Sequence, residues 1–416
     1  MEYGLIGMPL VHSFSKPIHE RLGGYTYELC PVNEDEAAAL LKGRSFKGIN
    51  VTIPYKQFAI PFCDELDPAA KAIGAINTIV NRRGRLIGYN TDFHGFRYLA
   101  KSIGVSFANK TVLILGGGAT RKTVYASAQN GGAARILVTS RQPGPDIISY
   151  EHACREDGVQ ILVNATPVGM YPRCENIPID PAIFPCLEAV LDVVYNPLET
   201  RLVQKARALG IPACCGLDML VAQAKYAAEL FLGRPLDDDS IYTISREIRA
   251  ERANLVLIGM PCSGKTSIGK ALAKRMGRPF VDIDELIVAE TGKAISDIFA
   301  EDGEAAFRDL EAAAVAKVSK ETGQIIATGG GAILRQGNVE LLRQNGILLH
   351  ILRPLNLLSV GPGRPLCQSL ADIEALWQAR APLYDATTQF KIINDGTKSQ
   401  ATQTAHEAFI AALDNR

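Results

Sequence analysis

The sequence predicts an α/β protein with largely parallel sheets, divided into two or three domains. The chain has 416 residues, whereas single hydrophobic cores stop growing at roughly 250 to 300 residues. Short apolar runs alternate with helical stretches along the whole chain, which is typical of βα units. This alternation starts again after a polar stretch and a charged helix. We therefore expect the main domain boundary near residues 250–253.

Composition and charge exclude several classes of protein. Apolar residues make up 47% and charged residues 21% of the chain, which is the globular average and argues against disorder. The 44 basic and 44 acidic side chains balance, so no nucleic-acid partner is expected. No apolar run reaches the roughly 18 residues of a membrane helix, and the first residues lack a signal-peptide pattern. Nine cysteines without a CxxC pair indicate reduced thiols, so we expect a cytoplasmic protein without a membrane partner.

Several polar residues in the first hundred positions stand at the ends of the predicted strands and helices. Ser13 and Ser15 precede a helix near residues 15–23, a geometry that can hold a carboxylate. Lys56 ends the predicted strand GINVTIPYK, and Asp92 follows in GYNTD. Taken alone, such a lysine is usually a surface residue. Beside a carboxylate, it suits protonation of a carbonyl oxygen whose carbon receives a hydride.

The next strand and helix have the layout of a dinucleotide-binding unit. The strand TVLIL ends at Gly116–Gly118, and a second strand ends at Ser140 and Arg141. A hydroxyl and a cation at that end suit a 2′-phosphate, which favours NADP over NAD. Because Arg121 occupies the third position of GxGxxG, a simple packing turn remains an alternative. Only 22 residues separate Arg141 from Asn164, too few for the usual helix and strand, so we expect a trimmed lobe.

The strongest motif lies in the second half of the chain. Residues 259–266 read GMPCSGKT, a complete GxxxxGK[ST] pattern between an apolar strand and an amphipathic helix. Backbone N–H groups and the helix N-terminus bind phosphates there, the lysine reaches the terminal phosphates, and the threonine hydroxyl can ligate Mg²⁺. We expect nucleoside triphosphate contacts from Gly259, Cys262, Ser263, Gly264, Lys265 and Thr266.

Acidic and basic residues downstream indicate what receives the phosphoryl group. Asp282 and Asp284 stand two apart at the end of a predicted strand, which would place both on one face. One carboxylate could hold Mg²⁺ through water while the other accepts a hydroxyl proton. Arg308, Arg364 and Arg380 follow, each of which is usually a surface residue when taken singly. Together they favour an anionic acceptor, because guanidinium binds carboxylates bidentately.

Residues 253–416 resemble shikimate kinase, since the P-loop, DxD, FRxxE, GGG, RPL and RxPLY motifs follow in order. The resemblance implies a P-loop α/β/α domain that binds ATP, with Mg²⁺ near Thr266 and Asp282. It implies that shikimate's ring hydroxyls contact Asp284, that its carboxylate contacts Arg308 and Arg380, and that Gly330 and Gly331 supply backbone contacts. Arg364 would cover the phosphates, and because the segment before it is short and carries no other arginine, we expect Arg364 to be indispensable.

Residues 1 to about 248 resemble shikimate dehydrogenase, since the serine segment and the motifs GINVTIPYK, GAINT, GYNTD, TVLILGGG, NATPVGM, DVVYNPLET and GLDMLVAQA follow in order. The resemblance implies a substrate lobe of residues 1–100 with about 225–248, and an NADP-binding Rossmann lobe of residues 101–224. Lys56 and Asp92 would be the catalytic pair. Substrate contacts would come from Ser13, Ser15, Thr52, Asn77, Tyr195 and Gln223. Cofactor contacts would come from Gly116, Gly117, Gly118, Ala119, Ser140, Arg141, Thr166, Gly216 and Met219.

Together the two resemblances imply a fusion of consecutive enzymes. The first part would reduce 3-dehydroshikimate to shikimate with NADPH, and the second would phosphorylate shikimate with ATP to shikimate 3-phosphate. Two alternatives stay open: a quinate/shikimate oxidoreductase with a kinase half, and a nucleotide- or shikimate-sensing protein with one inactive half. The groups suited to proton and phosphoryl transfer favour the bifunctional enzyme.

Overall fold

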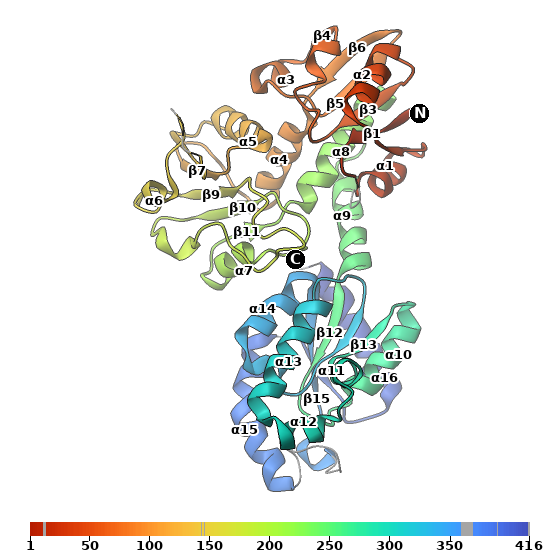
Figure 1. Ribbon diagram of the computed structural model, residues 1–416, viewed down its shortest axis with the longest axis vertical. Helices are drawn as coiled ribbons and strands as arrows, with labels where there is room; N and C mark the ends of the chain where they lie inside the picture. The colour runs from red at the N-terminus through yellow and green to blue at the C-terminus, as the bar shows by residue number, and fades with distance from the viewer. Residues whose placement is uncertain (11–13, 143, 145, 359–368, 389, 415–416) are drawn as a thin grey trace. The chain divides into compact units, whose positions relative to one another are not determined.

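A computed structural model of the chain describes residues 1–10, 14–142, 144, 146–358, 369–388 and 390–414. The described chain forms two compact units (Figure 1). The first comprises Met1–Asn196 with Thr200–Ser245, and the second comprises Pro197–Glu199 with Arg246–Arg416. The division falls inside helix α9 (Asp239–Arg252), a few residues before the expected boundary.

The first lobe of the first unit is built on a six-stranded sheet of order β2-β1-β3-β5-β6-β4. Contrary to the expected parallel arrangement, this sheet is mixed, because β5 runs antiparallel to both β3 and β6. The strands are β1 Tyr3–Gly7, β2 Glu28–Pro31, β3 Gly48–Val51, β4 Glu65–Leu66, β5 Thr78–Arg82 and β6 Arg85–Tyr89. The helices are α1 Ser15–Gly23, α2 Glu34–Gly43, η1 Ile60–Phe62, α3 Pro68–Ile73 and α4 Thr91–Ser102.

The second lobe of this unit has a five-stranded parallel sheet of order β11-β10-β9-β7-β8. Side chains of β7 alternate between two cores, as the period of a strand requires: Val112 and Ile114 face one side, Leu113 and Leu115 the other. The strands are β7 Thr111–Leu115, β8 Arg135–Thr139, β9 Ile161–Asn164, β10 Ala189–Asp192 and β11 Ala213–Cys214. The helices are α5 Ala119–Asn130, α6 Tyr150–Ala153, η2 Pro181–Ile183, α7 Arg201–Ala208 and α8 Leu217–Leu232.

The expected trimming of this lobe is confined to one helix. Between Arg141 and Asn164 the chain forms helix α6 and the strand β9. Helix α6 keeps only four residues, which is a single turn. The second lobe therefore has five parallel strands around the glycine loop.

Helices α4 and α8 pack against each other within the first unit (Figure 1). Their backbones come close at Gly95, where a Cβ atom would lie 2.6 Å from the carbonyl oxygen of Met219. Any larger residue at Gly95 would push the helices apart. The close approach brings the first turn of α4 beside the first turns of α8, where several predicted site residues lie.

The second unit has a parallel five-stranded sheet of order β13-β14-β12-β15-β16, as expected for a P-loop domain. Helices cover both faces: Leu255 and Leu257 of β12 pack toward α10 and α16, and Val256 and Ile258 toward α11, α13, α14 and α15. The strands are β12 Asn254–Ile258, β13 Phe280–Asp282, β14 Ile325–Ala327, β15 Gly346–Leu352 and β16 Lys391–Ile393. The helices are α10 Lys265–Met276, α11 Ile283–Thr291, α12 Ile295–Glu301, α13 Gly303–Val318, η3 Ala332–Leu334, α14 Gln336–Asn345, η4 Leu355–Leu357, α15 Leu370–Thr387 and α16 Lys398–Leu413.

Candidate active sites

A cavity of about 400 Å³ in the first unit gathers most residues predicted to bind the substrate. Its wall includes side chains from both lobes and from α1, α4 and α8. Of the predicted residues, the cavity is lined by Ser15, Thr52, Lys56, Asn77, Asp92, Tyr195, Gly216, Met219 and Gln223. Ser13 lies outside the described residues. Residues far apart in the sequence thus surround one space, which the order of motifs alone could not establish.

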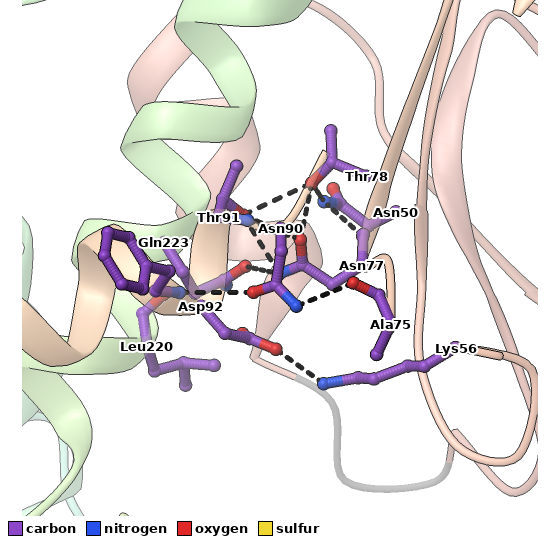
Figure 2. Close-up of polar contacts among 11 residues, drawn as sticks. Asn50, Lys56, Ala75, Asn77, Thr78, Asn90, Thr91, Asp92, Leu220 and Gln223 are labelled. Atoms are coloured by element: carbon purple, nitrogen blue, oxygen red, sulfur yellow. Dashed lines mark hydrogen bonds and ion pairs between the residues drawn. The ribbon is translucent and has the colours of Figure 1, made fainter. Parts of the chain in front are cut away.

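Lys56 and Asp92 form an ion pair at this cavity (Figure 2). The lysine Nζ lies 2.6 Å from Asp92 Oδ2, and the side chains are only 19% and 16% exposed. Asp92 stands in the first turn of α4, where the helix dipole stabilises a carboxylate. Asn90 fixes that helix start, because its Oδ1 accepts from the Phe93 N–H at 3.2 Å. The pair is therefore held in place by a capped helix on one side.

Lys56 does not end a strand, so that part of the sequence prediction is wrong. Strand β3 stops at Val51, and Lys56 lies in the turn that follows. Pro54 explains the early stop, since proline has no N–H for a strand ladder. The turn after β3, and not the strand itself, places Lys56 at the cavity.

Asn77 is the centre of a buried polar network beside the ion pair (Figure 2). Its Nδ2 donates to Thr91 Oγ1 at 3.0 Å and to Gln223 Oε1 at 3.4 Å, and its Oδ1 accepts from the Thr91 N–H at 2.7 Å. Asn50, which also lines the cavity, donates to Thr78 Oγ1 at 3.0 Å. The network fixes the amides that face the cavity.

Sequence reasoning had not assigned a role to the polar residues around Asn77 and the start of α4. Asn50 stands in GINVT, and Asn90 and Thr91 stand in GYNTD, so the quoted motifs contained them. The amide and hydroxyl side chains next to buried strands indicated a polar network, because buried polar groups need hydrogen-bond partners. Their partners could be found only from the fold.

The loop that connects β7 with α5 in the second lobe consists of three glycines, so its backbone carries no side chains. Gly116 has φ +120°, and a Cβ atom on it would lie 2.9 Å from the Ala165 carbonyl oxygen. On Gly117 a Cβ would lie 2.9 Å from Ser140 Oγ, and Gly118 is the N-cap of α5. Exposed N–H groups at a helix N-terminus fit the pyrophosphate of a dinucleotide.

The remaining predicted cofactor residues lie around this loop. Thr166 is held by its hydroxyl, which donates to Asn164 Oδ1 at 2.7 Å, and its methyl group faces Gly116. Arg141 is exposed just beyond the end of β8. Ala119 begins α5, Gly216 packs against the Val193 carbonyl, and Met219 lies in the first turn of α8. These residues and the bare loop fit a dinucleotide that carries a 2′-phosphate.

In the second unit, the P-loop adopts backbone angles that its glycines permit. Gly259 and Gly264 have φ values of +144° and +98°, and Cys262 has φ +64°. Lys265, only 8% exposed, donates to the carbonyl oxygens of Gly259 and Met260 at 2.8 Å. The Ser263 hydroxyl is buried and has no hydrogen-bond partner among the described residues. An unpaired hydroxyl beside bare N–H groups fits the oxygens of a nucleotide phosphate.

Thr266 and Asp282 form the pair expected near a magnesium ion. Thr266 Oγ1 donates to Asp282 Oδ2 at 2.7 Å. A hydroxyl and a carboxylate are oxygen donors of the kind that Mg²⁺ prefers, with further positions taken by water and substrate phosphates. Among the described residues no group of three or more His, Cys, Asp or Glu could hold a metal by itself. The donors present fit an ion that is shared with a nucleotide.

Asp284 is placed differently from the prediction, because β13 ends at Asp282 and Asp284 belongs to α11. Asp282 caps this helix and accepts from the Asp284 N–H at 3.0 Å. Burial, and then repulsion from Asp282, raise the pKa of Asp284 to about 6. Its Oδ1 is buried and has no hydrogen-bond partner in the part of the chain that the structure describes. A carboxylate of this kind can accept a proton near neutral pH.

Two predicted arginines lie in the same site as Asp284. Arg308 Nη1 donates to Glu311 Oε2 at 2.8 Å, and a Cβ on Gly331 would collide with the Arg308 guanidinium. Arg380 Nη1 donates to the Gly330 carbonyl oxygen at 3.1 Å. The missing side chain at Gly331 therefore leaves room for the Arg308 guanidinium, and the Gly330 carbonyl holds Arg380. Arg364 lies outside the described residues.

Glu311 and Tyr384 are site residues without an assigned role in the sequence analysis. Glu311 is completely buried, burial raises its pKa, and its Oε1 has no partner among the described residues. The Tyr384 hydroxyl donates to the Gly330 carbonyl oxygen at 2.6 Å. FRDLE and RAPLY contain both residues, so the signal was present in motifs that were read for their arginines alone.

Comparisons with known proteins follow the same division of the chain. The family model described as "Shikimate dehydrogenase substrate binding domain" matches residues 5–79, and the one described as "Shikimate kinase" matches residues 261–411. Within the described residues, no helix is long and apolar enough to cross a membrane.

Relatives cover the first part of the chain. A shikimate dehydrogenase (NADP(+)) from Caldanaerobacter subterraneus subsp. tengcongensis is 33% identical over 273 residues, which are 60% of this chain and 96% of the relative. One from Moorella thermoacetica is 36% identical over 257 residues, which are 55% of this chain and 87% of the relative.

Solved structures of dehydrogenases and of a reductase are also similar to this chain. A chorismate mutase/shikimate 5-dehydrogenase fusion protein from Clostridium acetobutylicum has a TM-score of 0.56 at 32% identity, covering 59% of this chain and 96% of that one. Shikimate 5-dehydrogenase from Thermus thermophilus, in complex with NADP(H) and shikimate, has a TM-score of 0.54 at 30% identity, covering 59% and 99%. A 5-ketofructose reductase of a Gluconobacter strain has a TM-score of 0.51 at 28% identity, covering 60% and 98%.

Proposed function

This chain belongs to the shikimate dehydrogenase family and carries a shikimate kinase domain behind it, and we propose that its two sites act in succession on one ring acid. It is a bifunctional enzyme of the shikimate pathway. The first site reduces 3-dehydroshikimate to shikimate with NADPH. The second site transfers the terminal phosphoryl group of ATP to the 3-hydroxyl of shikimate.

The observation that carries the first half of the proposal is the Lys56–Asp92 ion pair at the wall of the cavity. NADPH, when bound, supplies the hydride. Lys56 donates a proton to the oxygen of the ketone as negative charge develops there, and Asp92 holds the ammonium in position. The pair therefore supplies the acid that reduction of a ketone needs.

Recognition of the ring in the first site is assigned to the polar wall around this pair. Thr52, Asn77 and Gln223 bind ring hydroxyls, and the network behind Asn77 holds the amides in one orientation. Ser13, Ser15 and Tyr195 bind the carboxylate and the ring edge. Arg141 and Ser140 contact the 2′-phosphate, so NADPH is preferred over NADH.

In the second site, Asp284 accepts the proton of the attacking 3-hydroxyl. Its raised pKa leaves the carboxylate ionised at neutral pH yet basic enough to take a proton. Arg308 and Arg380 bind the shikimate carboxylate, with backbone contacts from Gly330 and Gly331. The room left by Gly331 beside the Arg308 guanidinium supports this assignment.

The phosphates of ATP are assigned to the P-loop and to the magnesium donors. Lys265 leaves the carbonyl groups of Gly259 and Met260 for the terminal phosphates, and the Ser263 hydroxyl gains a partner there. Mg²⁺, when bound by Thr266 and Asp282, neutralises charge on the phosphates. Arg364 covers the phosphates during transfer.

Two lysine variants of the full chain test this assignment. Lys56→Met should lower dehydrogenase turnover by roughly 10² to 10⁴ fold, because the proton donor of the reduction is lost. Kinase turnover should be unchanged, because Lys56 has no role in the second site. Lys265→Met should lower kinase turnover and leave dehydrogenase turnover unchanged. Matched controls are Lys71→Met on α3 and Lys274→Met on α10, both exposed. Dehydrogenase turnover retained in Lys56→Met, or kinase turnover retained in Lys265→Met, would remove the basis of the proposal.

A further inference from the structure

The first unit contains a second and larger cavity, of about 730 Å³, which we call the α4–α9 cavity. It is lined by the outer face of α4, by residues 105–107, by α5 and α8, and by the start of α9. It shares no lining residue with the cavity that holds Lys56 and Asp92. The proposed reactions make no use of it.

Two cations that line the α4–α9 cavity have no ion-pair partner among the described residues. Arg97 and Lys101 stand four residues apart on α4 and so lie on one face of the helix. In the described part of the chain neither forms an ion pair, and the Arg97 guanidinium lies over the Phe93 ring, 5.7 Å from its centroid. Nearby Lys225, by contrast, is paired with Asp238 at 2.7 Å. Two adjacent free cations in a hollow suit a carboxylate.

Aromatic side chains are concentrated in the same wall. Four of the fifteen lining residues are Tyr98, Phe107, Tyr226 and Tyr242, whereas aromatic residues make up 7% of the chain. Burial, reinforced by nearby carboxylates, raises the pKa of the Tyr98 and Tyr226 hydroxyls, so both remain donors at neutral pH. Such a wall offers ring faces for stacking and O–H groups for hydrogen bonds.

Ser127 adds a polar group that lacks its own partner. Its side chain is 1% exposed on α5, lines the α4–α9 cavity, and its Oγ makes no hydrogen bond among the described residues. A buried hydroxyl without a partner costs free energy. An oxygen atom of a ligand in the cavity would satisfy it.

We propose that the α4–α9 cavity binds a small carboxylate that carries an aromatic ring. Arg97 and Lys101 bind the carboxylate, the tyrosines and Phe107 enclose the ring, and Ser127 donates to an oxygen of the ligand. Asp239, the first residue of α9 and without an ion pair among the described residues, lines the same cavity. It would contact an ammonium group if the ligand is an amino acid.

Calorimetric titration of the full chain tests the proposal with three probes: 3-phenylpropanoate, L-phenylalanine and phenethylamine. Saturating shikimate is present throughout, so that the carboxylate subsites of both active sites are filled. The carboxylate probes should bind once per chain, and phenethylamine, which lacks the carboxylate, should not. Tighter binding of L-phenylalanine than of 3-phenylpropanoate would identify an amino acid through Asp239, and equal or weaker binding an acid without an ammonium group.

Variants locate the binding. Arg97→Gln and Lys101→Gln should each weaken 3-phenylpropanoate roughly tenfold, which is the effect of one charged hydrogen bond. Both side chains are exposed, so dehydrogenase turnover should be kept and show that the variants fold. Lys42→Gln, an exposed lysine on α2, is the matched control. Absence of binding by both carboxylate probes, equal binding of phenethylamine, or unchanged affinity in both cation variants would overturn the proposal.

Discussion

Replacing Asp284 with asparagine should stabilise the second unit and strongly lower kinase turnover. The pKa of Asp284 is raised from 3.8 to about 6 by burial and by Asp282. A raised pKa means that the folded chain binds the proton more tightly than the unfolded chain does. Stability from this group is therefore full below about pH 4 and is lost as the pH rises to about 6.

The size of the gain follows from that shift. Two pKa units at roughly 1.4 kcal/mol each set an upper limit of about 3 kcal/mol above about pH 6. Because a neutral amide keeps the shape without the charge, we expect Asp284→Asn to gain about 1 to 3 kcal/mol at about pH 8. Glu311 Oε1 and Asp284 Oδ1, which lack partners within the described ranges, both flank Gly329, so an amide at residue 284 could also donate to Glu311.

The assay uses the single tryptophan of the chain. Trp377 lies on α15 and packs beside His350 in the second unit, so its fluorescence during urea unfolding follows that unit. Kinase turnover of Asp284→Asn should fall by roughly 10² to 10⁴ fold, while dehydrogenase turnover is kept. Asp297→Asn, an exposed carboxylate on α12, should change stability by less than about 0.5 kcal/mol. Lower stability at about pH 8, or a gain as large at about pH 4, would refute the reasoning.

Three further substitutions test individual contacts. Arg141→Gln should raise the KM for NADPH roughly tenfold with little effect on NADH, as steady-state kinetics with both cofactors will show; equal effects would contradict a 2′-phosphate contact. Gly331→Ala should raise the kinase KM for shikimate, because the new methyl group displaces the Arg308 guanidinium, and an unchanged KM would exclude Arg308 from binding. Arg364→Ala should lower kinase turnover by roughly 10³ fold, and near-normal turnover would mean that Arg364 does not cover the phosphates.

The parts of the fold that were predictable are those encoded in short stretches. The P-loop was recognisable because its strand, its glycines at positive φ and its helix are consecutive in the chain. The antiparallel strand β5 was missed, since pairing partners in a sheet depend on contacts between distant segments. Local sequence patterns thus predicted the strands and helices, whereas contacts between distant segments determine how the strands pair.

Two misplaced residues had signals that were overlooked. Asp282 and Glu285 have the spacing of a helix cap and its third residue, which indicates that Asp284 begins a helix rather than ending a strand. Pro54 likewise marks the end of β3 before Lys56. In contrast, the hydrogen bond from Asn77 to Gln223 joins residues 146 positions apart, and the fold brings together the start of β5 and helix α8.

A single reaction mixture tests the central claim, that both sites act on the same ring acid. The full chain is mixed with 3-dehydroshikimate, NADPH and Mg·ATP, and NADPH oxidation and ADP release are followed together. NADPH should be consumed first, and ADP should follow after a lag until one ADP has formed for each NADPH. ADP release without NADPH, or complete NADPH oxidation with no ADP, would contradict the account.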